Sequence, residues 1–160
     1  MLFSPLCSGS SGNASYLAAG GVRLLVDAGV TAKRMESLLD MIDVSAKELD
    51  AILVTHEHSD HVSGVGVLSR RYDLPVYAAA ECWEHMPASL GDIATKNKRV
   101  FEPDHDFYLQ QLCVHPFSTP HDAAHAVGYS FFHDGKKLSI MTDIGHVASG
   151  MLDEVAGSDL

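Results

Sequence analysis

Residues 55–61 read Thr-His-Glu-His-Ser-Asp-His, which places four metal-binding side chains within six residues. The preceding segment, 49–54, is apolar and rich in residues typical of a buried strand. The ligand-type residues therefore follow the end of an expected strand, where a loop begins. They are His56, His58, Asp60 and His61. Ordinary core packing does not require this spacing, so we interpret the motif as a metal site.

The spacing of these four residues also bears on the number of ions. Positions i and i+2 of a strand share a face, so His56 and His58 can point to the same side. Asp60 and His61 are adjacent in sequence and are expected to point away from that pair. Donors in two directions suit two neighbouring divalent ions better than one. Imidazole and carboxylate ligands fit zinc or manganese, and iron is also compatible.

Two further ligand-type residues come after later expected strands. His121 lies on the loop after the strand expected at 112–118, and Asp143 directly follows the one expected at 137–142. Either residue alone would be a weak signal, because histidines are common in loops and aspartates often end strands. Their order after the first motif makes both of them candidate ligands.

Composition limits the class of protein. The chain has 160 residues, 46% hydrophobic and 20% charged, which predicts one globular domain over residues 1–160. Its net charge of -10 argues against a broad basic surface for nucleic acid. The charge does not exclude an anionic substrate in a pocket, because two bound cations would attract a phosphate locally.

Targeting and cysteine usage point to one compartment. No apolar run approaches the ~20 residues of a membrane helix, and the N-terminus lacks the features of a signal peptide, so we expect no membrane association. The three cysteines, Cys7, Cys82 and Cys113, form no CxxC pair, which argues against a disulfide framework or a cysteine zinc site. A cytoplasmic location is therefore expected.

Hydrophobic periodicity and turn residues predict the elements, with strands early and late and helices mainly between them. Strands are expected at 3–6, 14–17, 22–26, 49–54, 75–78, 107–110, 112–118, 127–132 and 137–142. Helices are expected from the N-cap Thr31 to about Ile42, after the capping box Ser45-x-x-Glu48, over 62–72 and over 81–86. This pattern favours an α/β fold in which helices cover a sandwich of sheets.

Several segments together resemble the metallo-β-lactamase-fold hydrolase superfamily, and within it the bacterial YycJ/WalJ/VicX-type subgroup. The segments are Cys7 to Tyr16, Thr55 to Gly64, His121 to Ala124, and Gly135 to Leu138 running into Thr142-Asp143. The resemblance spans nearly the whole chain. It implies an αββα sandwich of the metallo-β-lactamase type that lacks its C-terminal part.

The resemblance also implies roles for individual residues. It assigns His56, His58 and His121 to the first ion, Asp60 and His61 to the second, and Asp143 to a bridge between them. Asp60 is the residue expected to be essential for catalysis. Asp27, which follows the strand expected at 22–26, either supports the site by hydrogen bonding or simply forms a turn. The loop 8–13 either presents backbone N–H groups to an anion or is a tight turn.

The function implied is that of a dinuclear phosphodiesterase that acts on nucleic acid, with exonuclease-like action through metal-activated water. A thioester or lactone hydrolase of the glyoxalase-II type is the first alternative, because the same ligands would serve either reaction. A metal-binding regulatory partner without turnover is the second. The ligand set leaves the identity of the metal, DNA or RNA specificity and the oligomeric state open.

The end of the chain leads to a further expectation. Members of the superfamily have a final histidine ligand for the second ion, and nothing after Asp143 clearly supplies it. We therefore expect residues 157–160 to begin another strand, and the chain to be the N-terminal portion of a longer protein that is inactive without the rest. His146 is either a proton donor or a loop residue. The remaining histidines are expected to be structural or exposed.

Overall fold

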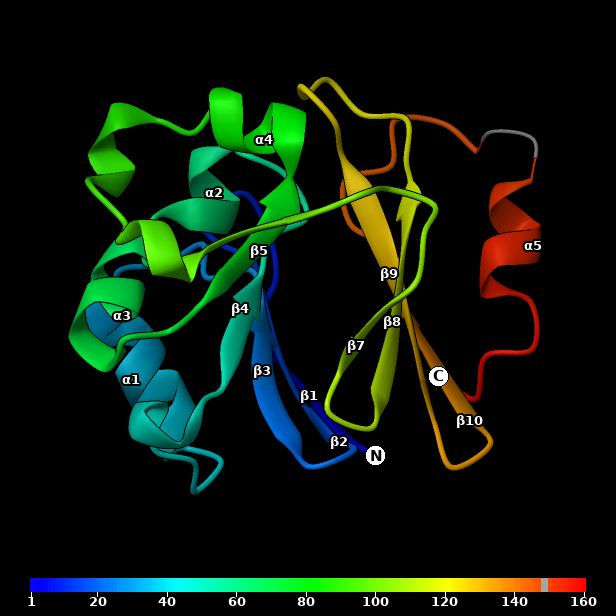
Figure 1. Ribbon diagram of the computed structural model, residues 1–160, viewed down its shortest axis with the longest axis horizontal. Coiled ribbons are helices and arrows are strands. Elements are labelled where there is room, and N and C mark those ends of the chain that lie inside the picture. The colour runs from blue at the N-terminus through cyan, green and yellow to red at the C-terminus, as the bar shows by residue number, and fades with distance from the viewer. Residues whose placement is uncertain (148–149) are drawn as a thin grey trace.

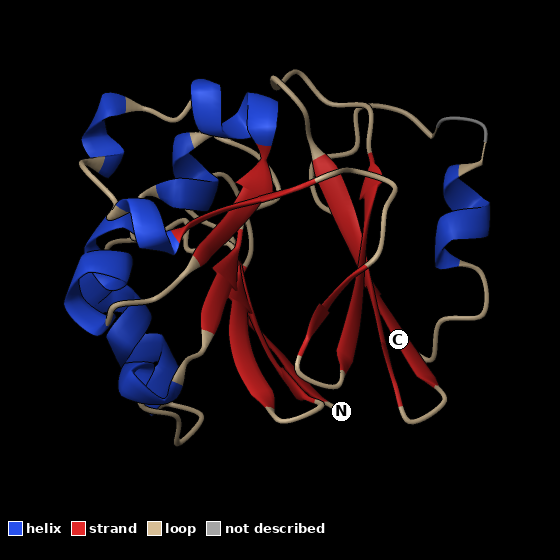
Figure 2. Cartoon of the chain, viewed as in Figure 1, coloured by secondary structure: helices blue, strands red, loops and turns tan. Residues whose placement is uncertain are grey.

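The computed structural model describes residues 1–147 and 150–160. Two β-sheets pack face to face, with helices on the outer side of each, so the layers run α, β, β, α (Figure 1, Figure 2). This arrangement confirms the α/β sandwich predicted from the sequence. Within the described residues, no helix combines the length and the apolar character that crossing a bilayer would need.

The first sheet has six strands in chain order. They are β1 (Leu2–Cys7), β2 (Ala14–Ala19), β3 (Val22–Val26), β4 (Ala51–Leu53), β5 (Val76–Ala79) and β6 (Lys98–Phe101). Strand β2 pairs antiparallel with both β1 and β3, and β3 to β6 run parallel. The parallel strands therefore end at the same edge of this sheet, where segments with ligand-type residues begin.

The second sheet is antiparallel, in the order β10, β9, β8, β7. Its strands are β7 (Phe107–Leu109), β8 (Leu112–Ser118), β9 (Val127–His133) and β10 (Lys136–Ile140). Since β8 and β10 both lie antiparallel to β9, they run in the same direction. The loops after β8 and β10 therefore leave the sheet at one end, beside the loops that follow the parallel strands (Figure 1).

Most helices cover the outer face of the first sheet, and one lies outside the second (Figure 1). The first group is α1 (Ala32–Asp40), α2 (Ser59–Val62), α3 (Val65–Tyr72) and α4 (Ala80–Glu84), and the outlying helix is α5 (Met151–Val155). Short 3-10 turns span Ala46–Glu48, Ala88–Leu90 and Thr95–Asn97. The caps predicted at Thr31 and Ser45 are confirmed, because both hydroxyls accept backbone N–H bonds.

A continuous apolar core fills the space between the sheets and under the helices. Tyr129, Phe131, Leu17 and Leu24 are among its fully buried side chains. Burying side chains of this size contributes about 1.5–3 kcal/mol each to folding. The core fixes the two sheets against each other, and thereby the positions of the loops at the site end.

The helix predicted over 62–72 is wrong in its bounds. Helix α2 begins earlier, within the histidine motif, and the helix is interrupted at Ser63 and Gly64 before α3 begins. The Gly64 N–H donates to the Ala28 carbonyl at 2.8 Å. A Cβ on Gly64 would lie 2.4 Å from the Val30 carbonyl oxygen, so the contact requires glycine and separates the two helices. Asp60 and His61 consequently lie on a helical turn and not in a loop.

Other boundaries also differ from the predictions. The strand predicted at 49–54 is shorter, and the one predicted at 137–142 ends at Ile140, before Asp143. Strand β6 and helix α5 were not predicted. Three of the four residues of β6 are exposed, so no alternating pattern marks the strand.

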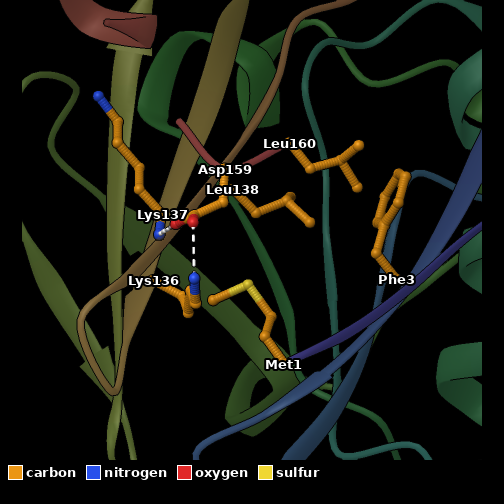
Figure 3. A pocket seen from close by; sticks show the side chains of 7 residues that line it. All are labelled: Met1, Phe3, Lys136, Lys137, Leu138, Asp159 and Leu160. Carbon is orange, nitrogen blue, oxygen red and sulfur yellow. Dashed lines mark hydrogen bonds and ion pairs between the residues drawn. The ribbon is translucent and has the colours of Figure 1, made fainter. Parts of the chain in front are cut away.

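A cleft of about 320 Å³ lies where the outer edges of the two sheets approach each other. Figure 3 shows Met1 and Phe3 on one side, and Lys136 to Leu138 with Asp159 on the other, and Leu160 lies between Leu138 and Phe3. The strand expected to begin at 157–160 is not formed. The last two residues of the chain nevertheless lie along β10, since the Asp159 N–H donates to the Lys137 carbonyl and the Ser139 N–H donates to the Leu160 carbonyl.

Gly29 holds the first loop of the site against the histidine motif. A Cβ at this position would lie 1.6 Å from the backbone oxygen of Asp60 and 2.6 Å from the backbone nitrogen of Asn13. We expect Gly29→Ala to destabilise the metal-free protein by about 3 kcal/mol or more, measured by urea unfolding. Gly145→Ala is the control, because its nearest neighbour would be 3.3 Å away. Equal stability of both variants would contradict this packing.

Candidate metal centre

Three of the candidate histidines face one another at the end of the sandwich. The ring centroids of His56 lie 4.7 Å from those of both His58 and His121, and the last two are 5.0 Å apart. His58 Nδ1 and His121 Nε2 approach to 3.2 Å. These three residues come from the loops after β4 and β8, and together they could hold one metal ion.

A second group shares His56 with the first. His61 Nε2 lies 2.6 Å from Asp143 Oδ2, and His56 Nε2 lies 3.7 Å from the same oxygen. These three residues also offer ligand atoms within 4.8 Å of one another and could hold an ion. The two adjoining groups share His56, and Asp60 belongs to neither of them.

The side chains of Asp60 and His61 point in different directions, although the two residues are adjacent in sequence. His61 points back into the site, with its ring centroid 4.0 Å from that of His56. Asp60 stays at the rim, where its side chain is 30% exposed and its Oδ2 lies 3.7 Å from His61 Nε2. The helical turn explains this difference, since neighbouring residues in a helix point about 100° apart.

Asp27 lies beneath the histidines and organises them. It is 1% exposed, and its Oδ1 accepts the Thr55 N–H at 2.8 Å. Its Oδ2 accepts the Thr55 hydroxyl at 2.8 Å and contacts His61 Nδ1 at 2.7 Å. A carboxylate can only accept, so His61 Nδ1 carries the proton and Nε2 keeps its lone pair. The supporting role of Asp27 therefore has a structural basis, although its φ of 61° also fits a turn.

The same network sets the tautomer of His56. The Thr55 hydroxyl donates to Asp27, so its oxygen is free to accept a hydrogen bond from the His56 Nδ1–H at 3.0 Å. His56 Nε2 then carries a lone pair, is buried, and has no hydrogen-bond partner among the described residues. A buried acceptor aimed at two other imidazoles fits a metal ion, which would complete its bonding.

The protonation of the two central histidines differs. Burial, and then the nearby His61, His121 and His58, lowers the pKa of His56 to about 3. His56 is therefore neutral at physiological pH, as a metal ligand must be. Burial alone would lower the pKa of His61, but Asp27, Asp143 and Asp60 outweigh it and raise that pKa.

Asn13 links the loop 8–13 to the metal motif and was not singled out in the sequence. Its Oδ1 accepts the Gly9 N–H at 3.0 Å, which orients the amide. Its Nδ2 then faces His61 Nε2 at 3.0 Å and Asp60 Oδ2 at 3.4 Å. Sequence offered one signal, since an asparagine after a Gly/Ser loop often bonds to the local backbone. Its contact across 48 residues to His61 could not be read from that signal.

The remaining histidines and acids lie away from these two groups. Asp122 and His146 are exposed loop residues. His115 contacts the carboxylates of Asp106 and Glu154, and His125 contacts the Ser118 hydroxyl. His85, His105 and His133 likewise interact with neighbouring loop or helix atoms. These contacts confirm that the histidines without a motif are structural or exposed.

The opposite pKa shifts predict how the stability of the metal-free protein depends on pH. The pKa of His56 is depressed from 6.5 to about 3, so its contribution is lost as pH falls through that window. The pKa of His61 is raised above 6.5, so its contribution is present below that value and lost as pH rises through the folded pKa. These two groups together favour maximal stability near pH 6.5.

The measurement is urea unfolding in chelator across pH. His56→Asn should flatten the acid side of the wild-type curve, and His61→Asn the alkaline side. Identical slopes in wild type and both variants would contradict these assignments.

The fold and the paired ligand groups define a metallo-hydrolase scaffold. The family model described as the metallo-beta-lactamase superfamily matches residues 8–157. The chain therefore belongs to the metallo-β-lactamase superfamily, as the motifs predicted.

Two curated relatives are similar to nearly the whole of this chain. The chain is 40% identical over 157 residues to the exodeoxyribonuclease YycJ of Bacillus anthracis, covering 98% of this chain and 60% of that protein. It is 41% identical over 159 residues to the exodeoxyribonuclease WalJ of Streptococcus pneumoniae, covering 98% of this chain and 59% of that protein. The chain thus spans about 60% of the length of these relatives.

A solved structure supports the fold independently. A mutant metallo-β-lactamase of Cronobacter sakazakii with the HARLDQ motif superposes with a TM-score of 0.68 at 14% identity. The match covers 92% of this chain and 59% of that one. At this level of identity the likeness concerns the fold alone.

Proposed function

We propose that this protein is a dinuclear metal-dependent phosphodiesterase that removes nucleotides from the end of a nucleic acid. The observation that carries the proposal is the convergence of two ligand groups that share the buried His56. In the proposal, residues 1–160 belong to one metallo-hydrolase domain that uses zinc or manganese. The proposed ligands are His56, His58 and His121 for one ion, Asp60 and His61 for the other, and Asp143 for both.

Bound divalent ions would supply a low pKa for coordinated water and would offset the charge of a phosphoryl group. The chain's own residues prepare the site for them. Asp27 and Thr55 keep the lone pairs of His56 and His61 pointed into it. Asp60 and Asp143 are the acids in reach of an incoming substrate, since their side chains are 30% and 38% exposed, and the Asn13 amide holds Asp60.

The substrate class rests on the relatives and on charge. YycJ and WalJ are named exodeoxyribonucleases, which favours DNA as the substrate here. The net charge of -10 offers no general attraction for a polyanion. An end of a strand that enters a local cation site needs no extended basic surface, which is consistent with exonuclease action.

Turnover by the purified full-length protein with Mn²⁺ or Zn²⁺ tests the proposal. We expect nucleotides to be released from linear DNA but not from closed circular DNA, and release to stop with a chelator. Cleavage of an acyl thioester alone would favour the glyoxalase-II-type alternative. Metal binding without any turnover would favour the regulatory partner. Full activity of Asp60→Ala would remove Asp60 from the mechanism.

A further inference from the structure

The loop of residues 119–126, which carries His121, contains no helix or strand. Its base is closed by the Thr119 N–H, which donates to the Ala126 carbonyl at 2.9 Å. Val127 N–H donates to the Thr55 carbonyl at 3.0 Å, which ties the same base to the start of the histidine motif. These two bonds fix where the loop leaves the sheet, but not the path of its far side.

One side chain of the motif reaches that far side. Glu57 Oε1 accepts the Ala124 N–H at 2.8 Å. Glu57 stands between His56 and His58 in sequence, so the contact joins the loop to the backbone that carries two other candidate ligands. The approach of His58 to His121 at 3.2 Å is a second contact between the same two segments.

Glu57 is half-buried, and its two carboxylate oxygens have different surroundings. Oε1 accepts the Ala124 N–H in an exposed hydrogen bond, whereas Oε2 is buried without a hydrogen-bond partner among the described residues. Burying a carboxylate oxygen in this way is unfavourable, whereas a glutamate without a structural task would turn towards water. The Ala124 bond gives a reason for the side chain to remain inside.

We propose that Glu57 is a positioning residue that orders the loop 119–126, so that His121 faces His58 before an ion arrives. This inference rests on the proposed metal site. An ordered loop has already lost the conformational entropy that ion binding would otherwise have to overcome. Without the tether, we expect the affinity of the three-histidine group to fall about 10–100-fold, as for other residues that orient ligands.

Cobalt titration and hydrogen exchange test the proposal in the 160-residue chain. In Glu57→Ala, we expect faster exchange of the Ala124 amide in the metal-free protein and about 10–100-fold weaker Co²⁺ binding. Glu57→Gln should restore both, because its carbonyl oxygen can still accept the Ala124 N–H. Glu84→Ala, which removes an exposed glutamate from α4, is the matched control and should behave as wild type.

The outcomes separate this inference from the proposed function. Failure of the unaltered chain to bind Co²⁺ would overturn the metal site itself. Equal Co²⁺ affinity in wild type and Glu57→Ala would overturn only the role of Glu57. An unchanged Ala124 exchange rate in Glu57→Ala, or a Glu57→Gln variant as impaired as Glu57→Ala, would also overturn it.

Discussion

Replacing His56 with alanine should abolish tight binding of the first proposed ion, weaken binding of the second, and lower turnover about 10³-fold or more. His56 is a proposed ligand of the first ion, and its Nε2 lies 3.7 Å from Oδ2 of Asp143, the proposed bridge to the second. Its Nε2 is also the buried acceptor that has no other partner among the described residues. The metal content after dialysis, and nucleotide release from linear DNA, would measure the two effects.

Two further substitutions make this prediction specific. His121→Ala removes a ligand of the first proposed ion and leaves Asp60, His61 and Asp143, the proposed ligands of the second, so it should lose the first ion without losing the second. His105→Ala removes an exposed imidazole whose side chain is 67% accessible, and it should bind both ions normally. Retention of a tightly bound first ion by His56→Ala would contradict the ligand role of His56.

The local part of the site was accessible from the sequence because the motif is short and follows a strand. Residues 56–61 are close together in sequence, so their proximity in space can be expected without knowledge of the fold. His121 and Asp143 required the further assumption that strand ends converge, and the structure brings both beside His56. The parallel direction of β8 and β10 within an antiparallel sheet is the physical reason.

The supporting contacts were not accessible in the same way. Asn13, Thr55 and Glu57 act through hydrogen bonds to segments distant in sequence, and their residue types are common in any loop. Whether a neighbour of a ligand points into the site depends on the local helix. For this reason the different environments of Asp60 and His61 were missed.

The secondary structure could likewise be predicted from the sequence only in part. Strands with alternating or continuous apolar residues were placed close to their observed bounds. Strand β6 escaped because it is mostly exposed at the edge of its sheet, and α5 because it has only five residues. The break between α2 and α3 was missed because it depends on a backbone contact of Gly64 with another loop.

The second large effect is expected at Asp27, which touches neither ion in the proposal. Asp27→Asn keeps the shape of the side chain and, at φ 61°, the left-handed backbone that asparagine tolerates. Its oxygen would still accept the Thr55 N–H, which prevents the amide from turning over. Its NH₂ group would then replace the oxygen that faces His61 Nδ1.

This replacement reverses the direction of one hydrogen bond. The amide would donate to His61 Nδ1, which moves the imidazole proton to Nε2, the atom that faces Asp143. A protonated Nε2 cannot bind a metal, so we expect the affinity for the second ion to fall about 10–100-fold. Long-range ¹H–¹⁵N spectra of the imidazoles would report the tautomer, and competition titrations the affinity.

The free energies of unfolding of two Asp27 variants distinguish a change of the His61 tautomer from a general loss of stability. Asp27→Ala leaves the Thr55 N–H and a buried imidazole without their partner, and should lower the free energy of unfolding by about 3–5 kcal/mol. Asp27→Asn retains part of the network and should cost only about 1–3 kcal/mol. Asp43→Asn, exposed and at φ 56°, is the matched control and should change neither quantity. If Asp27→Asn binds two ions as tightly as wild type, then Asp27 does not set the ligand atom of His61.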